Sequence, residues 1–145
     1  MRRADVEAVC AIEQRSYPFP WSKGIFSDCL RIGYCCRVAE LGNRLGGYAI
    51  LSSGAGESHL LNLCVDPDHR RRGLAQLLLD GLLVDARLLG AARMFLEVRP
   101  SNRAAMVLYG NNDFRVIGRR PDYYPSEIGR EDALVMARHL DEEHD

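Results

Sequence analysis

Lysine is almost missing from this sequence. Lys23 is the only lysine among the 19 lysine and arginine residues of the 145-residue chain. Arginine stays protonated at working pH and cannot serve as a base. A mechanism that uses lysine therefore has one candidate residue, and any other proton acceptor must be an aspartate, glutamate, histidine, cysteine or tyrosine.

Long apolar runs and a strong excess of charge are missing too. No apolar stretch approaches the roughly 20 residues that a membrane-spanning helix needs. No segment at the start of the chain has the charged and then apolar pattern of a signal peptide. The net charge of −1 does not favour nucleic-acid binding. We therefore expect a cytoplasmic protein that does not bind a membrane.

Cysteine and histidine occur too sparsely for a disulfide framework or a metal site. The five cysteines are odd in number and form no C-x-x-C pair, which fits reduced thiols. The four histidines lack metal-ligand spacing, so we expect no metal. A chain of 145 residues, 47% of them hydrophobic, can bury its own core as a single domain over residues 1–145.

Apolar periodicity, glycines and prolines divide the chain into helices and strands. The predicted helices cover residues 5–17, 22–32, 73–89 and 103–110, with Asp5 and Ser22 as caps; the predicted strands cover 34–41, 45–52, 57–65, 93–98, 114–118 and 132–139, with a loop over 121–129. This order predicts an α/β fold with a mixed, mostly antiparallel central sheet flanked by helices. Residues 1–4 are too few for a full strand before the first helix, so we expect the first strand to be truncated.

The strongest local signal lies between the strand over 57–65 and the helix that follows it. A strand that passes through a glycine turn into a helix N-terminus leaves free N–H groups and a partial positive charge, which favours an anion such as a phosphate. Gly73 supplies the turn, and the sequence has neither a G-K-[ST] nor a G-x-G-x-x-G motif. A basic, solvated loop or an arginine contact to nucleic acid is the alternative.

This segment resembles a known family. Arg70-Arg71-Arg72-Gly73-Leu74-Ala75 matches the R/Q-x-x-G-x-G/A pattern of the GNAT acetyltransferases, and the match continues in order with Glu97, Ser101-Asn102 and Tyr109. The resemblance is closest to the branch that acetylates the N-terminal amine of ribosomal proteins. It rests on the segments 12–15, 19–22, 62–67, 96–99, 123–125 and 129–133, and it spans nearly the whole chain. One departure is Asn112-Asp113, which replaces a leucine-glycine pair and affects the end of the helix before it.

The resemblance implies acetyl-CoA as co-substrate and assigns residues to it. The backbone of Leu63, Cys64 and Val65 would pair with the pantetheine arm, and Asn102 would contact the cofactor. The residues expected to surround the pyrophosphate are Arg70, Arg71, Arg72, Gly73, Leu74, Ala75 and Gln76.

The resemblance also assigns Glu97 as the general base and Tyr109 as the general acid. The chemistry suits an α-amine, because its pKa of about 7.7–8.0 leaves roughly a tenth of it neutral at neutral pH, so a modest base suffices. Glu97 could act directly or through water if partial burial raises its pKa. Cys64 is an alternative nucleophile, but the sequence places no histidine to activate it.

The acceptor site is expected to lie between two aromatic segments. Tyr123 and Tyr124 would shape it from one side and Phe19 and Trp21 from the other. Packing over the sheet edge is the alternative for the two tyrosines. Glu13 would face the acceptor peptide or, equally, lie on a solvated helix face.

The resulting hypothesis is an enzyme that acetylates the N-terminal α-amine of a protein, with a small-subunit ribosomal protein as the expected acceptor. The alternatives are the same chemistry on a small-molecule amine or an internal lysine, and an acetyl-CoA-binding module without turnover. An RNA-binding role of the arginines is disfavoured by the near-neutral charge. The sequence does not determine the oligomeric state, for which a monomer is the expectation.

Overall fold

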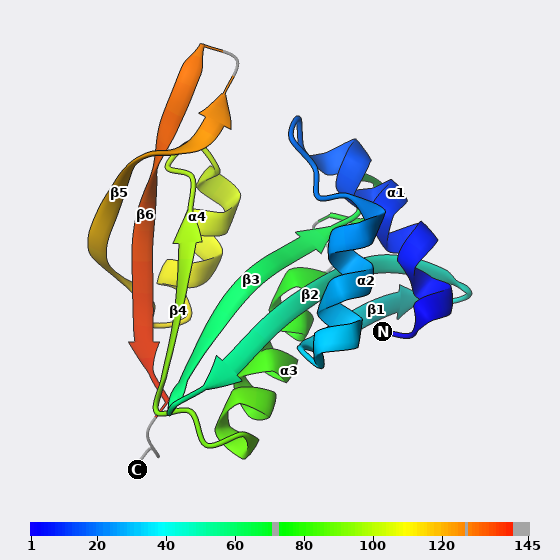
Figure 1. The fold of residues 1–145 in the computed structure, drawn as a ribbon, viewed down its shortest axis with the longest axis horizontal. Coiled ribbons are helices and arrows are strands. Elements are labelled where there is room, and N and C mark those ends of the chain that lie inside the picture. The colour runs from blue at the N-terminus through cyan, green and yellow to red at the C-terminus, as the bar shows by residue number, and fades with distance from the viewer. Residues whose placement is uncertain (71–72, 127, 141–145) are drawn as a thin grey trace.

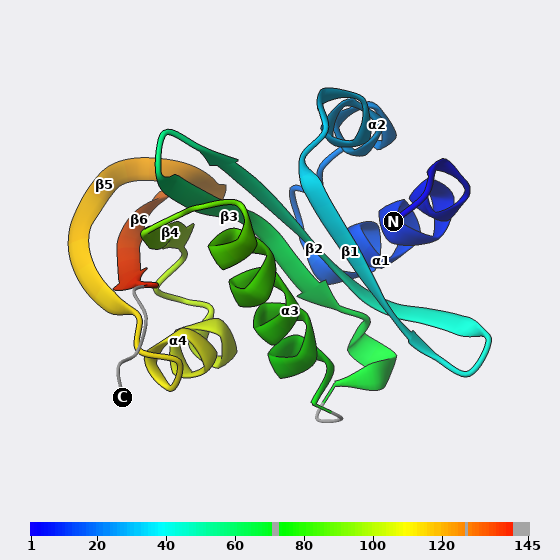
Figure 2. The same ribbon diagram turned by 90° about the horizontal axis from the view of Figure 1, so that it is seen from below.

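A six-stranded sheet with helices on both faces organises the chain (Figures 1 and 2). The structure is a computed structural model and describes residues 1–70, 73–126 and 128–140. The helices are α1 (Val6–Ser16), α2 (Lys23–Ile32), α3 (Leu74–Leu88) and α4 (Arg103–Gly110). The strands are β1 (Cys35–Leu41), β2 (Arg44–Gly54), β3 (Glu57–Val65), β4 (Arg93–Val98), β5 (Arg115–Ser126) and β6 (Gly129–His139).

The strand order is β1-β2-β3-β4-β6-β5, with one parallel pair, β3 and β4. All other neighbours are antiparallel, which confirms the predicted mixed, mostly antiparallel sheet. Helices α1 and α2 cover one face over β1–β3, and α3 and α4 cover the other (Figure 2). Each face has its own apolar cluster: leucines of α3 on one side, and Val9, Ile12, Phe26 and Tyr48 on the other.

In the described part of the chain, no strand precedes α1. Residues Arg3–Asp5 form a 3-10 turn, which agrees with the expected loss of a full first strand. The cap predicted for Asp5 is wrong, because its carboxylate accepts the Arg2 N–H at 2.8 Å and makes no cap hydrogen bond to α1. The cap of α2 is confirmed: Ser22 Oγ accepts the Ile25 N–H.

The loop predicted over residues 121–129 is also wrong. Strand β5 continues to Ser126, and β6 begins at Gly129, so the two strands form one long hairpin. Pro121 and Asp122, with φ of 52° at Asp122, belong to an irregularity between Arg120 and Tyr124, after which pairing resumes. A bulge contains the same residue types as a loop, and only the pairing partner distinguishes the two.

The parallel pair β3–β4 is short and opens at one end. Its register runs from Glu57 with Arg93 to Leu60 with Leu96 and stops there. Beside this point, Ile50 and Leu51 of β2 face Asn62 and Leu60, so Leu61 is an extra residue that makes a bulge in β3. Beyond the bulge β3 and β4 diverge (Figure 1). The far half of β3 therefore pairs with β2 along one edge and presents its other edge to the gap.

None of the helices in the described ranges is long and apolar enough to span a membrane.

Candidate active site

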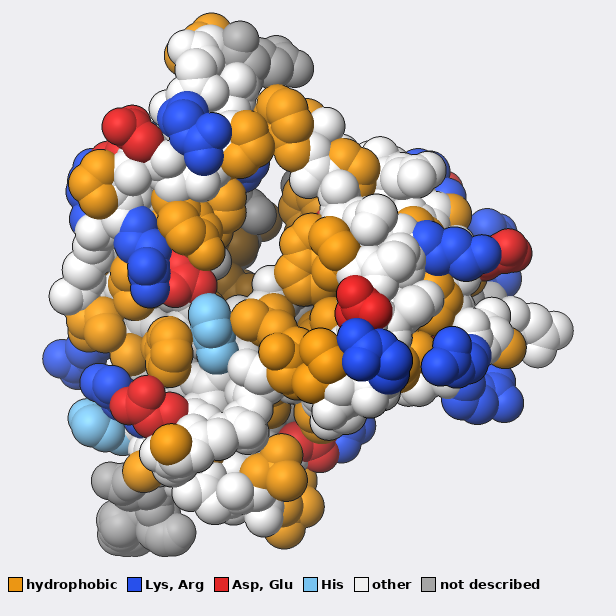
Figure 3. All heavy atoms as spheres, in the orientation of Figure 1, with side chains coloured by type: hydrophobic (Ala, Val, Ile, Leu, Met, Phe, Trp, Pro, Cys, Tyr) orange, Lys and Arg blue, Asp and Glu red, His pale blue; other side chains and the backbone are white. Residues whose placement is uncertain are grey.

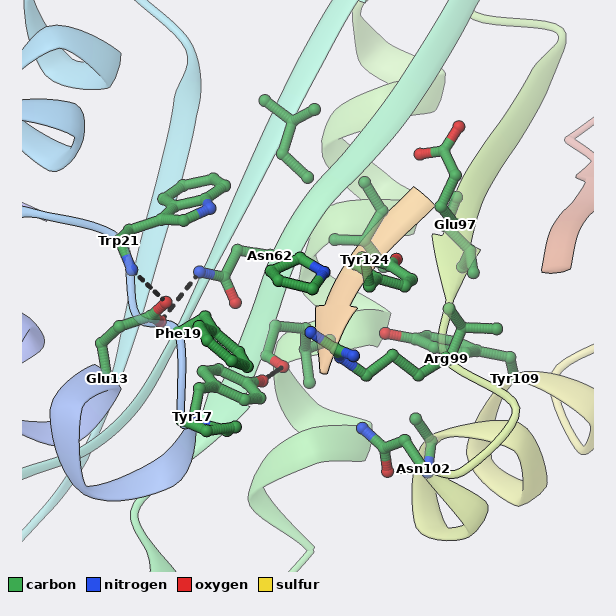
Figure 4. A pocket seen from close by; sticks show the side chains of 18 residues that line it. Glu13, Tyr17, Phe19, Trp21, Asn62, Glu97, Arg99, Asn102, Tyr109 and Tyr124 are labelled. Atoms are coloured by element: carbon green, nitrogen blue, oxygen red, sulfur yellow. Dashed lines mark hydrogen bonds between the residues drawn. The ribbon is translucent and has the colours of Figure 1, made fainter. Parts of the chain in front are cut away.

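Two adjoining cavities lie where β3 and β4 diverge. The small cavity, of about 320 Å³, is lined by the end of α1, the α1–α2 connection, β3, β4 and Tyr124. The large cavity, of about 930 Å³, extends from the same region to the start of α3. Tyr17, Phe19, Arg99 and Tyr109 border both, so the two cavities form one continuous site. Figure 3 shows the hollow, bordered largely by apolar side chains, and Figure 4 shows the small cavity.

The large cavity ends at the turn before α3. Gly73 has a φ of 77°, a conformation that glycine adopts without strain, and its carbonyl accepts the first helical bond from Leu77 N–H. The N–H groups at the start of α3 thus have no partner within the helix. The lining residues here are Arg70, Gly73, Leu74, Ala75 and Gln76, which belong to the segment predicted to surround a pyrophosphate. The predicted Arg71 and Arg72 lie outside the described residues.

The free edge of β3 forms one wall of the large cavity. The Asp66 N–H donates a hydrogen bond of 2.7 Å to the carbonyl of Gly46 on β2. Backbone N–H and C=O groups point to alternate edges of a strand, so those of Cys64, two residues earlier, also point toward β2. The backbone groups of Leu63 and Val65 point away from β2. The Leu63 carbonyl accepts a hydrogen bond of 3.4 Å from Tyr17 Oη, and the Val65 carbonyl accepts one of 3.4 Å from Arg70 Nε. Two of the three predicted backbone positions therefore face the cavity.

An amide pair joins the two helices that flank the large cavity. Gln76 of α3 and Asn112 after α4 each donate to the other, at 2.8 and 3.0 Å, and Asn112 also donates to the Leu108 carbonyl at 2.7 Å. Asn112 belongs to the pair Asn112-Asp113 that departs from the family pattern, and here it ties the end of α4 to α3. Asn102 caps α4 through Ala105 N–H and lines both cavities.

Glu97 lies on β4 at the point where the strands separate. Its Oε1 is 2.6 Å from His59 Nε2 and its Oε2 is 3.4 Å from Arg120 Nε. The hydrogen bond from His59 lowers the pKa of Glu97, and the charge of Arg120 adds to this effect, although burial opposes both. The condition considered from the sequence, that partial burial raises the pKa of Glu97, is therefore not met.

Tyr109 of α4 is buried beneath the junction of the two cavities. Burial raises the pKa of its phenol, so the hydroxyl keeps its proton at neutral pH. The ring packs edge-on against Phe114, and the hydroxyl points into the small cavity near Arg99 (Figure 4). The carboxylate of Glu97 points away from it, so the structure places the two groups apart along the same cavity.

The two tyrosines of β5 have different positions. Tyr124 lines the small cavity, and the Arg99 guanidinium lies 4.4 Å from the centre of its ring. Arg99 is itself held by Glu131 of β6 at 3.1 Å. Tyr123 lines neither cavity and packs edge-on against Tyr124, 43% exposed. Of the two, Tyr124 alone borders the described cavities.

The opposite wall is held in place by a buried carboxylate. Phe19 and Trp21, which were predicted to shape the acceptor site, line the small cavity. Glu13 is only 2% exposed and accepts hydrogen bonds from Trp21 N–H at 2.9 Å, from Asn62 Nδ2 at 3.0 Å and from the Tyr48 hydroxyl. Figure 4 shows it below Trp21 and Asn62. The alternative of a solvated helix face for Glu13 is therefore wrong.

Sequence reasoning missed several residues of this site. His59 and Asn62 lie on β3 and Arg120 lies on β5, and only the register brings them beside Glu97 or Glu13. The sequence held a signal for Arg99, because this residue directly follows β4 and functional residues often lie in the loops that follow strands. In the described part of the chain, no three His, Cys, Asp or Glu side chains are placed to hold a metal ion.

Comparisons with known proteins agree with this architecture. The model of the acetyltransferase (GNAT) family matches residues 6–114. The chain is 37% identical over 137 residues, 94% of this chain and 93% of the other, to a protein named ribosomal protein bS18-alanine N-acetyltransferase from Escherichia coli strain K12. Its fold matches the crystal structure of the ribosomal-protein-S18-alanine N-acetyltransferase from Escherichia coli with a TM-score of 0.91 and 35% identity, covering 100% of this chain and 94% of that one. It also matches yncA from Salmonella typhimurium, solved with its cofactor acetyl-CoA, with a TM-score of 0.83 and 21% identity, covering 100% and 94% of the two chains.

The three donors around Glu13 generate a prediction about stability. Glu13→Gln replaces an acceptor oxygen by an N–H₂ group that faces donors, which leaves buried groups unpaired and should lower the free energy of unfolding by about 1–3 kcal/mol. Urea unfolding measures this change. The matched control is Glu7→Gln on the same helix, where the side chain is exposed and the expected change is small. Equal stability of Glu13→Gln and the control would contradict the structural role of Glu13.

Proposed function

Because the chain belongs to the acetyltransferase (GNAT) family, we propose that it transfers the acetyl group of acetyl-CoA to the N-terminal α-amine of a protein. The proposed acceptor is a small-subunit ribosomal protein, in line with the name of the Escherichia coli relative. The observation that carries the proposal is the continuous site itself. One end offers the free N–H groups of a helix, and the other holds a carboxylate and a protonated phenol.

The large cavity fits the shape and charge of acetyl-CoA. The N–H groups that follow Gly73 suit a pyrophosphate, because they and the helix dipole favour negative charge. The backbone groups of Leu63 and Val65 face the cavity and suit the amides of a pantetheine arm. Asn102 borders the passage from this cavity to the small one.

The small cavity supplies the proton acceptor and the proton donor. When the reaction occurs, a bond forms between the amine nitrogen and the acetyl carbon, the carbon–sulfur bond breaks, and the sulfur leaves with the electron pair. Glu97 takes the proton that the amine loses, and Tyr109 gives a proton to the sulfur. The raised pKa of Tyr109 keeps that proton available at neutral pH. A backbone N–H of β3 is suited to the acetyl oxygen as it gains charge.

The lowered pKa of Glu97 bears on the choice of acceptor. A weak base removes a proton more readily from an amine of pKa about 7.7–8.0 than from a lysine of pKa about 10.4. The hydrogen bond from His59 makes Glu97 a weaker base than an isolated glutamate. The lower pKa of the α-amine therefore favours an N-terminal acceptor over an internal lysine, whatever the strength of the base.

The position of Cys64 favours direct transfer over a covalent acetyl-enzyme. Its side chain is buried, 3% exposed, in the apolar cluster between the sheet and α1 and α2. A buried thiol among apolar side chains is a packing residue and is poorly placed for nucleophilic attack.

A panel of peptides tests the proposed acceptor. We expect release of free CoA with a peptide that begins with a free alanine from a ribosomal protein, and little release when the same peptide is blocked at its N-terminus and carries an internal lysine. Thiol release measures the rates. Equal rates with the blocked peptide would support a lysine acceptor. Acetyl-CoA binding without turnover of any amine would support a binding module.

Gly73 tests the pyrophosphate site. A carboxylate side chain at this turn would oppose an anion and obstruct the close approach of the backbone, so Gly73→Glu should raise the KM for acetyl-CoA at least about tenfold and the KM for the peptide much less. Steady-state kinetics with each substrate varied measures both values. The control is Gly90→Glu at the other end of α3, which has a similar φ of 84° and open space for a side chain. A similar KM change in both variants would assign the effect to backbone strain.

Glu97→Gln tests the general base. Glutamine keeps an oxygen that can accept from His59 but cannot take the amine proton, so kcat should fall roughly 10²-fold near neutral pH. The deficit should shrink as the pH rises past the pKa of the acceptor amine, because the amine then arrives neutral. A pH–rate series for both forms measures this.

The matched control for Glu97→Gln is Glu57→Gln, which alters a half-exposed glutamate paired with Arg93 at the far end of the same strand pair. It should leave kcat within about twofold of wild type, as expected for a surface ion pair. Wild-type kcat in Glu97→Gln would exclude Glu97 as the base.

A further inference from the structure

His59 and Glu97 face each other across the last paired positions of β3 and β4. The register sets His59 beside Phe95, and the His59 ring stacks on Phe95 with centroids 4.5 Å apart and planes 18° apart. Glu97 lies two residues further along β4 on the same face, where its Oε1 meets His59 Nε2 at 2.6 Å. The stacking fixes the plane of the ring, and the hydrogen bond then fixes the carboxylate.

The geometry determines which nitrogen carries the proton. A carboxylate can only accept, so Nε2 of His59 must donate, and the neutral ring holds its proton on Nε2. The side chain of Glu97 is 7% exposed, whereas that of His59 is 28% exposed. The imidazole therefore reaches solvent, where it can gain a second proton, while the carboxylate stays largely covered.

We propose that His59 is a positioning residue for Glu97, and that it makes the basicity of Glu97 depend on the protonation of an imidazole. The proposal rests on the proposed function of Glu97 as the base. A neutral His59 holds Oε1, so that Oε2, which lies 3.4 Å from Arg120 Nε, keeps a fixed orientation in which to take the amine proton. A protonated His59 places a full positive charge beside the carboxylate, which stabilises its charged form and weakens it as a base.

The direction of the pH effect follows from this. Imidazoles ordinarily titrate between pH 5 and 8. When His59 gains a proton, the pair gains a positive charge and acetyl transfer slows, in addition to the loss caused by protonation of the acceptor amine.

The other charged groups near the pair do not supply this dependence. Arginine keeps its charge throughout, and a carboxylate paired with arginine stays ionised over the same interval. Among the described residues on this face, the charged or titratable groups near His59 are Glu57 on β3, Arg93 and Glu97 on β4, Arg120 on β5 and His139 on β6. On β2 the residue beside His59 is the uncharged Ser52. His139 is exposed and its register partner is Arg93, so it lies away from Glu97.

The test compares His59→Gln with wild type. Glutamine can place an N–H₂ near the position of Nε2 and donate to Glu97, but it does not titrate. We expect the ratio of kcat, His59→Gln over wild type, to rise at least about threefold from about pH 7.5 to about pH 5.5 with saturating acetyl-CoA and peptide. Using the ratio cancels the titration of the acceptor amine, which both enzymes share. His139→Gln is the matched control, and its ratio should stay flat.

His59→Phe separates positioning from folding. Phenylalanine keeps the stacking on Phe95 and removes the hydrogen bond, so kcat should fall at least about fivefold while the KM for acetyl-CoA stays near that of wild type, as expected for a lost bond to a charged group. A KM change of equal size would indicate a structural role only and would overturn the proposal.

A readout without turnover completes the test. The titration of His59, followed by NMR of the histidine ring in the wild-type protein, should shift to lower pH in Glu97→Gln, because the carboxylate that favours the imidazolium is gone. Identical titrations, or a flat ratio of kcat for His59→Gln, would overturn the coupling. Failure of the wild-type enzyme to acetylate any free N-terminus would instead overturn the proposed function, and the NMR titration would still judge the pair.

Discussion

The bulge at Leu61 and the early end of the β3–β4 pairing are the constraint on which the rest of the site depends. A parallel pair normally continues along the strands, and here it stops after Leu60 and Leu96. The extra residue in β3 restores pairing with β2 beyond the bulge and turns Asn62 toward Glu13 of α1. The edge that remains free has no strand to satisfy it, so a bound molecule can use its backbone groups. A cleft in the middle of a sheet follows from one inserted residue.

The same opening determines where the chemical groups lie. Glu97 sits one residue beyond the last position at which β4 pairs with β3, so its carboxylate is held by His59 of the paired part while the cavity begins beside it. Tyr109 approaches from the other face through α4. Polar contacts hold the two walls of the small cavity in place: hydrogen bonds to Glu13 on one side, and the ion pair between Arg99 and Glu131 on the other. Each functional group is thus oriented by a neighbour from a different element.

Local signals in the sequence were sufficient for the turn before α3, because Gly73 and the free helix N-terminus depend on adjacent residues alone. The cap of Ser22 and the mixed sheet were predicted for the same reason. The hairpin of β5 and β6, the burial of Glu13 and the partner of Glu97 depend on register between distant segments. No periodicity within one strand specifies the register of its neighbour, and a bulge such as that at Leu61 reverses which residues face which side. The direction of the pKa of Glu97 has the same origin, since its burial was foreseeable from the sequence and its contact with His59 was not.

Because the pKa of Glu97 is lowered, the rate of the proposed reaction depends on the pKa of the acceptor amine. Taking a proton from an amine costs more as the gap between the two pKa values widens, by about 1.4 kcal/mol for each unit. The bond from His59 widens that gap for every amine equally, but an α-amine begins about 2.5 units closer to the base than a lysine. In the proposed mechanism, the contact with His59 orients Glu97, whereas the preference for weakly basic N-termini over lysine comes from the lower pKa of the α-amine.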